Sequence, residues 1–151
     1  MDTITTDAIT REVTIDATPE TVWRILTEPE HIFRWWFAKA EFEPVAGTSG
    51  HILFRVGGHE YPTELAILAA DAPSFLALRW CHPAGEAATE RNSTLVEFTL
   101  EPMGAQTLLR VVESGLATIE WDDATKAAYL ESHTEGWKHH LRDLGQYMAW
   151  L

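Results

Sequence analysis

The sequence has almost no cysteine, because Cys81 is its single thiol. One thiol cannot form a disulfide within the chain. Cys81 stands next to His82, but neighbouring residues on a strand point to opposite faces of a sheet. We therefore expect an ordinary cysteine near the end of a strand and no pairing of a nucleophile with a base.

Basic residues are also scarce. The chain has 11 Lys and Arg against 23 Asp and Glu, which gives a formal net charge of −12, and the basic residues form no run. A chain of this charge repels nucleic acid and anionic membranes on average. We therefore expect neither as a partner, and we expect a monomer or a weak homodimer.

Long hydrophobic runs are missing as well. No apolar stretch reaches the roughly 18 residues that a membrane span needs. The first residues, "MDTITTDAITREVTIDA", are polar and acidic and lack the basic and apolar regions of a secretory signal. The expectation is a cytoplasmic protein.

Familiar catalytic and metal-binding motifs are absent. The glycines of "VGGHE" lack the following helix that a phosphate-binding loop needs, so ATP hydrolysis by this chain is not expected. His133 and His140 are seven residues apart on a predicted helix, about 10 Å along its axis, which is too far for one metal ion. We expect no metal and no cofactor, with His139 facing solvent and His133 as the one histidine of this helix that faces a pocket.

Tryptophan, by contrast, is abundant. The seven tryptophans are Trp23, Trp35, Trp36, Trp80, Trp121, Trp137 and Trp150. Each buried indole N–H needs a hydrogen-bond partner. So many in 151 residues indicate a large core or a cavity lined by aromatic side chains.

The hydrophobic pattern predicts a strand that includes Ile9, Val13 and Ile15 on one face, followed by two short helices. In "TPETVWRILTEPE", Thr18 is expected to cap the first helix, with Pro19 at its first position. The second helix covers "EPEHIFRWW" and is expected to form a V with the first.

From residue 39 the hydrophobic period changes to two. Strands are predicted at 39–46, 50–57, 61–70, 75–81, 93–101 and 106–114, with short turns that suit antiparallel pairs. A final helix, capped by Asp122 or Asp123, is predicted to run to the C-terminus. No linker divides the chain, so we expect one domain over residues 1–151.

This order predicts an α+β fold in which a curved, seven-stranded antiparallel sheet wraps around a long C-terminal helix. The two short helices after the first strand hold the sheet and the long helix apart at one end. The space between them is expected to form an enclosed cavity for an apolar ligand.

The chain resembles the SRPBCC superfamily, whose START-related, Bet v 1-like domains have the helix-grip fold. Within it, the chain is most similar to the activator of heat-shock protein 90 ATPase homologue family. The resemblance is carried by "ITREVTIDATPETVWRILTEPEHIFRWWF", "STLVEFTLEP", "TLLRVVESG" and "HTEGWKHHLRDLGQYM", and it covers almost the whole chain. It implies a binding fold whose members include ligand carriers, cyclases and a eukaryotic co-chaperone. That co-chaperone has a separate N-terminal domain for its main chaperone contact, which we expect this chain to lack.

Strand parity and helix spacing select the residues expected to bind the ligand. They are Trp35, Trp36, Phe54, Tyr61, Leu78, Trp80, Phe98, Glu113, His133, Trp137 and Leu141. Glu113 shares a strand face with Leu109 and Val111. A carboxylate facing a cavity is desolvated, so its pKa is expected to rise, and it is a weak candidate for a general base.

Three functions remain open at this stage. The first is binding of a small hydrophobic or aromatic ligand, with a stress-related role among the options. The second is a cyclase- or hydrolase-like enzyme that uses Glu113 or His133 as acid or base. The third is an interaction protein that acts on a chaperone.

Overall fold

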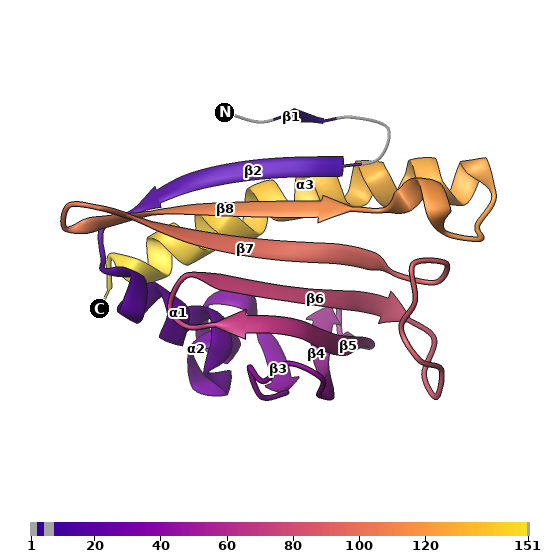
Figure 1. Ribbon diagram of the computed structural model, residues 1–151, viewed down its shortest axis with the longest axis horizontal. Coiled ribbons are helices and arrows are strands. Elements are labelled where there is room, and N and C mark those ends of the chain that lie inside the picture. Colours follow the sequence, from indigo (N-terminus) through magenta and orange to yellow (C-terminus); the bar gives the residue numbers. More distant parts are fainter. Residues whose placement is uncertain (1–2, 5–7, 151) are drawn as a thin grey trace.

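Antiparallel strands form one curved sheet in residues 3–4 and 8–150, which the computed structural model describes (Figure 1). The strands are β1 (Thr3–Ile4), β2 (Ala8–Ile15), β3 (Ala38–Glu41), β4 (Ser49–Val56), β5 (His59–Asp71), β6 (Phe75–His82), β7 (Thr94–Met103) and β8 (Gln106–Ser114). Their order across the sheet is β1-β2-β8-β7-β6-β5-β4-β3. The predicted seven-stranded sheet is confirmed, and the two-residue β1 extends its β2 edge.

Two short helices follow the first long strand, as predicted. They are α1 (Pro19–Thr27) and α2 (Pro29–Trp36). The apolar residues of α1 are buried, and a proline opens each helix. Thr18 occupies the position before α1, but its hydroxyl bonds to Thr21 Oγ1 and not to the helix backbone, so the expected side-chain cap is wrong.

The long helix α3 (Asp123–Met148) follows a short 3₁₀ turn, η1 (Leu116–Thr118). Asp122 Oδ1 accepts a hydrogen bond from the Thr125 backbone N–H at 2.7 Å, which confirms one of the two predicted caps. The helix ends at Met148, a little before the predicted end.

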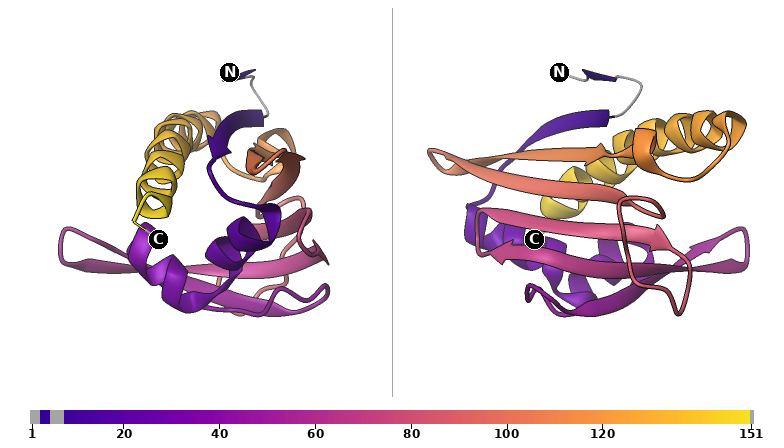
Figure 2. Two further views of the ribbon diagram at one scale, coloured as in Figure 1. Left: turned by 90° about the vertical axis from the view of Figure 1, so that its left-hand side faces the viewer. Right: turned by 45° about the vertical axis from the view of Figure 1, so that its right-hand side comes forward.

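The sheet curves around α3, and the two short helices lie at the side where α3 ends (Figure 2). α3 packs against β2 and against α2. This is the predicted helix-grip arrangement. Within the described residues, no helix combines the length and the apolarity that a bilayer span requires.

Along the strands, side chains that are buried in the core alternate with side chains that are more exposed. On β8, Thr107, Leu109, Val111 and Glu113 are buried, while residues between them are more exposed. The register sets Val96 of β7 opposite Glu113 and Phe98 opposite Val111. The strand that was predicted at 39–46 ends at Glu41, because a turn begins soon after it.

Candidate functional site

A buried carboxylate lies between the sheet and α3. Glu113 comes from the inner face of β8 and is only 2% exposed. Its Oε1 accepts hydrogen bonds from His133 Nδ1 at 2.9 Å and from Trp137 Nε1 at 2.8 Å. Its Oε2 accepts from Trp80 Nε1 at 2.8 Å, and from the hydroxyls of Thr94 and Tyr129, each at 2.6 Å.

We call Glu113 with these five donors the Glu113 cluster. Trp80 belongs to β6 and Thr94 to β7, while the other three donors are on α3. Tyr129, His133 and Trp137 are spaced four residues apart, so they share the face of the helix that points to the sheet. Thr94 and Tyr129 were missed by sequence reasoning, although this spacing was a signal for Tyr129.

The expected rise in the pKa of Glu113 is wrong. Burial by itself raises the pKa, but the hydrogen bond and the charge of His133 and the hydroxyls of Thr94 and Tyr129 outweigh it. Together they lower the pKa from 4.5 to about 2. The carboxylate is therefore ionised and already accepts five hydrogen bonds, which makes it a weak base and suits it to holding other side chains in place.

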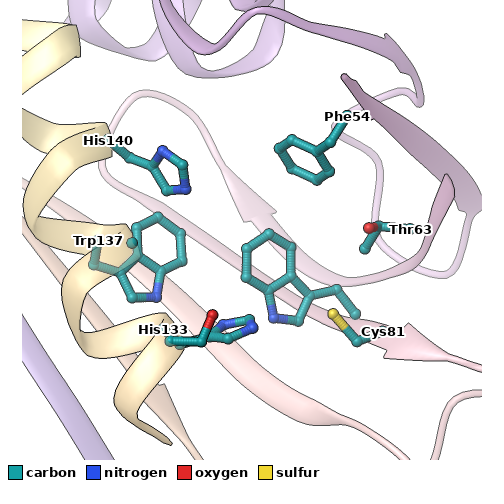
Figure 3. Close-up of a pocket in the computed structure, with 9 residues that line it drawn as sticks. Phe54, Thr63, Cys81, His133, Trp137 and His140 are labelled. Atoms are coloured by element: carbon teal, nitrogen blue, oxygen red, sulfur yellow. The ribbon is translucent and has the colours of Figure 1, made fainter. Parts of the chain in front are cut away.

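A cavity of about 250 Å³ lies beside the Glu113 cluster and opens to solvent (Figure 3). Its lining residues are Phe54, Thr63, Trp80, Cys81, Ser132, His133, Gly136, Trp137 and His140. In Figure 3, His133, Trp137 and His140 project from α3 toward the side of the sheet that carries Phe54 and Thr63. The predicted enclosed cavity is thus an open one, because aromatic side chains fill the deeper space.

That filling is visible in the ring contacts. Trp80 and Trp137 stack with ring centroids 5.4 Å apart, and Phe98 meets Trp137 edge-on at 5.8 Å. Trp36 lies between Phe54 and Trp137, 5.2 Å and 6.1 Å from their rings. A void of only about 10 Å³ remains among Trp36, Trp80 and Phe98, so no ligand enters there.

The predicted ligand residues therefore separate into groups. Phe54, Trp80, His133 and Trp137 line the open cavity. A second set does not line it and belongs to the core: Trp35, Trp36, Leu78, Phe98, Glu113 and Leu141. Placing Tyr61 in the cavity is wrong, because its side chain is 53% exposed on β5.

The histidines of α3 also differ from expectation. His139 is exposed, as predicted. His140 lines the cavity together with His133, so the expectation of a single cavity histidine is wrong. Burial is the main cause that lowers the pKa of His140 from 6.5 to about 4, and this ring is neutral near pH 7.

Cys81 is the unpaired residue where the pairing of β5 and β6 shifts register, and its φ is +66°. This irregularity turns it to the cavity rim. Burial is the main cause that raises the pKa of its thiol to about 12. A thiol that stays protonated is a poor nucleophile, in line with the expectation of an ordinary cysteine.

The site offers no evident metal centre. In the part of the chain that the structure describes, no three His, Cys, Asp or Glu side chains come together as a metal site requires. What the arrangement provides is an aromatic cavity with a histidine held by a buried carboxylate.

Comparison with known proteins places the chain in a family. Residues 16–149 match the family described as "Activator of Hsp90 ATPase homolog 1-like protein". No match was found among proteins with curated descriptions.

Solved structures share the fold. A protein of Mesorhizobium loti is 25% identical, with a TM-score of 0.73, and the match covers 94% of this chain and 96% of that one. A protein of Arthrobacter aurescens is 17% identical, with a TM-score of 0.81 and coverage of 100% and 92%. The Aha1 dimer of Colwellia psychrerythraea is 21% identical, with a TM-score of 0.71 and coverage of 93% and 95%.

Proposed function

Because the chain belongs to the activator of Hsp90 ATPase homolog 1-like family, which shares the SRPBCC helix-grip fold, we propose that it binds a small, planar, largely apolar molecule. The site is the open cavity between α3 and strands β4 to β6. The observation that carries the proposal is the cavity of about 250 Å³ beside an otherwise filled core, with Phe54, Trp80 and Trp137 among its walls.

The dimensions and walls of the cavity suit an aromatic ligand. Pockets for drug-sized ligands usually measure about 300–1,000 Å³, so this cavity fits a smaller molecule of one or two fused rings. Aromatic walls favour flat partners that stack or meet them edge-on.

A glycine in the middle of α3 supports the proposal. Gly136 lies within a 26-residue helix and lines the cavity. Glycine in a helix interior costs about 1 kcal/mol relative to alanine. A Cβ at this position meets nothing closer than His140 Nε2 at 3.7 Å, so packing does not require glycine. The missing side chain instead leaves space in the cavity.

This glycine supplies the test of the proposal. Gly136→Leu should fill the cavity and abolish the binding of naphthalene-sized ligands, as measured by calorimetric titration. Gly145→Leu is the matched control, because Gly145 is on the same helix and a Cβ there meets no atom within 4 Å. Wild type and Gly145→Leu should bind with micromolar affinity, about −8 kcal/mol. Equal binding by both variants, or no binding by wild type, would contradict the proposal.

A second candidate function is interaction with a chaperone, which the family description names as the partner of its type member. The observation that favours it lies away from the cavity. Phe37 at the end of α2 is 67% exposed and lines a surface groove with Trp150, which is 88% exposed. Phe33, four residues before Phe37, is exposed as well.

Exposed aromatic side chains that gather on one surface are typical of protein contacts. If this candidate is right, the chain should accelerate the ATPase of an Hsp90 chaperone, and Phe37→Ser with Trp150→Ser should remove that effect. The Gly136→Leu variant is the control, since its change is in the cavity. No acceleration by the wild-type chain would exclude this function.

A further inference from the structure

One polar atom of the cavity wall has a fixed direction and no partner among the residues that the structure describes. His133 Nδ1 forms a hydrogen bond with Glu113 Oε1 at 2.9 Å. Its Nε2 has no hydrogen-bond partner among the described residues. The fully buried side-chain atoms that lack a partner do not include Nε2, so this atom is exposed. This nitrogen is therefore accessible from the cavity.

The contacts of His133 also determine which nitrogen carries the proton. Glu113 accepts hydrogen bonds from two indole N–H groups and two hydroxyls, which hold it as a carboxylate, and a carboxylate only accepts hydrogen bonds. Nδ1 must then be the protonated nitrogen. In the neutral ring, Nε2 holds a lone pair and is a hydrogen-bond acceptor.

The ring of His133 is held from two further directions. Tyr129 stacks on it with centroids 3.7 Å apart and an interplanar angle of 15°, and Trp80 meets it edge-on at 5.7 Å. Both partners also donate to Glu113. The ring is therefore positioned before a ligand arrives, which reduces the entropy lost on binding.

The carboxylate of the Glu113 cluster is closed to a ligand. Glu113 is 2% exposed, and its two oxygens already accept five hydrogen bonds. A cationic ligand cannot reach this carboxylate directly. A ligand anion would face the lone pair of His133 Nε2 in a chain of net charge −12.

We propose that His133 determines the specificity of the cavity by accepting a hydrogen bond at Nε2 from a hydroxyl on the ligand, with Glu113 as its positioning residue. The ligand class is a neutral planar aromatic alcohol of the phenol type. This inference rests on the proposed binding function and specifies its ligand.

Three probes of nearly equal shape test the inference by calorimetric titration at about pH 8. They are 2-naphthol, which donates a hydrogen bond; 2-methoxynaphthalene, which does not; and 2-naphthoate, which is an anion. The wild-type chain should bind 2-naphthol about tenfold more tightly than 2-methoxynaphthalene, which corresponds to about 1.4 kcal/mol and lies within the range for one hydrogen bond. It should bind 2-naphthoate least well.

Two variants assign the effect to one nitrogen. His133→Phe keeps a ring but removes Nε2, so 2-naphthol and 2-methoxynaphthalene should bind equally. His139→Phe is the control on the same helix, because His139 is exposed, and it should keep the tenfold preference. A preference that survives His133→Phe and disappears in His140→Phe would overturn the inference.

His133→Phe also removes a donor to Glu113, which can impair folding of the variant. Nitrogen-15 NMR of the wild-type imidazoles avoids that problem. His133 should show a protonated Nδ1, 2-naphthol should shift its Nε2 resonance, and Glu113→Gln should change the ratio of the two tautomers. A His133 that is protonated at Nε2, or insensitive to 2-naphthol, would overturn the inference.

The outcomes separate the two proposals. If none of the probes binds to the wild-type chain, the binding function itself is wrong. If all three bind equally and Gly136→Leu abolishes their binding, the cavity binds ligands and only the role of His133 is wrong. Tightest binding of 2-naphthoate would mean that His133 acts as a donor, which also contradicts the inference.

Discussion

Glu113 is the residue on which the interior of the protein depends most. Its carboxylate is 2% exposed and connects β8 to β6, β7 and three positions on α3. A buried charge is costly by itself, and here the five donors compensate for the lost hydration. Residues from several elements are thereby held in one arrangement.

Removing this charge should destabilise the fold strongly. In Glu113→Gln an amide group faces several N–H and O–H donors that it cannot satisfy. Breaking a buried charged pair on one side typically costs about 3–5 kcal/mol. Urea unfolding should show a loss of that order, while Glu101→Gln, at an exposed position of β7, should stay within about 0.5 kcal/mol of wild type. A loss below about 1 kcal/mol would contradict the importance of the cluster.

The lowered pKa of Glu113 also predicts how stability depends on pH. The folded-state pKa is about 2, below the ordinary value of 4.5. A carboxyl of this kind stabilises the fold above its unfolded pKa, and the contribution is lost as the pH falls from about 4.5 toward 2. Across that pH interval, the difference in unfolding free energy between wild type and Glu113→Gln, measured by urea unfolding, should decrease. A gap that stays constant or widens on acidification would show that the pKa is not lowered.

At the scale of elements, α3 combines a packing face with a cavity face. Trp137, Leu141 and Leu144 are buried against the sheet. Gly136 and His140 lie beside them and line the cavity. The same helix therefore packs against the sheet and lines the cavity. Substitutions at the adjacent positions Gly136 and Trp137 should have opposite effects on stability.

Trp137 should be the main anchor of α3. It is 1% exposed, stacks on Trp80 and donates to Glu113. Trp137→Ala should cost roughly 3–5 kcal/mol of unfolding free energy, and Trp137→Phe less, because a benzene ring remains and only the N–H donor and part of the indole volume are lost. Lys138→Ala, at an exposed position, is the control. If Trp137→Ala melts within a degree or two of wild type, the assigned role is wrong.

Gly136 should behave in the opposite way. Gly136→Ala adds a methyl group without a close contact and improves helix propensity, so it should raise the unfolding free energy by about 0.5–1 kcal/mol. Chemical denaturation of Gly136→Ala and Gly145→Ala measures both positions. Destabilisation at Gly136 alone would mean that the cavity wall does not accept a Cβ.

At the scale of the whole molecule, charge sets which partners are excluded. A net charge of −12 opposes binding to nucleic acid, whose affinity comes largely from clustered Lys and Arg on phosphates. A gel-shift experiment at low salt, with duplex and single-stranded probes, should show no complex at micromolar protein. Tight binding that weakens steeply with added salt would refute this expectation.

The sequence was sufficient to predict the fold because the local signals agree. Prolines open both short helices, Asp122 caps α3, and alternation marks the long strands. The sequence was less sufficient to predict the chemistry of the candidate site. Parity placed Glu113 inside correctly, but the direction of its pKa shift depends on donors such as Thr94 and Tyr129, which are far apart in sequence.

By itself, therefore, the sequence determined the order of the elements, the inward faces of β2, β7 and β8 and the acidic character of the chain, because propensity, periodicity and charge are properties of neighbouring residues. Only the tertiary structure decided how the aromatic side chains share the interior. It filled the deep space with Trp36, Trp80 and Phe98 and left a cavity beside Gly136. It also gathered five donors from three elements around Glu113, since packing between distant segments has no signature in local sequence.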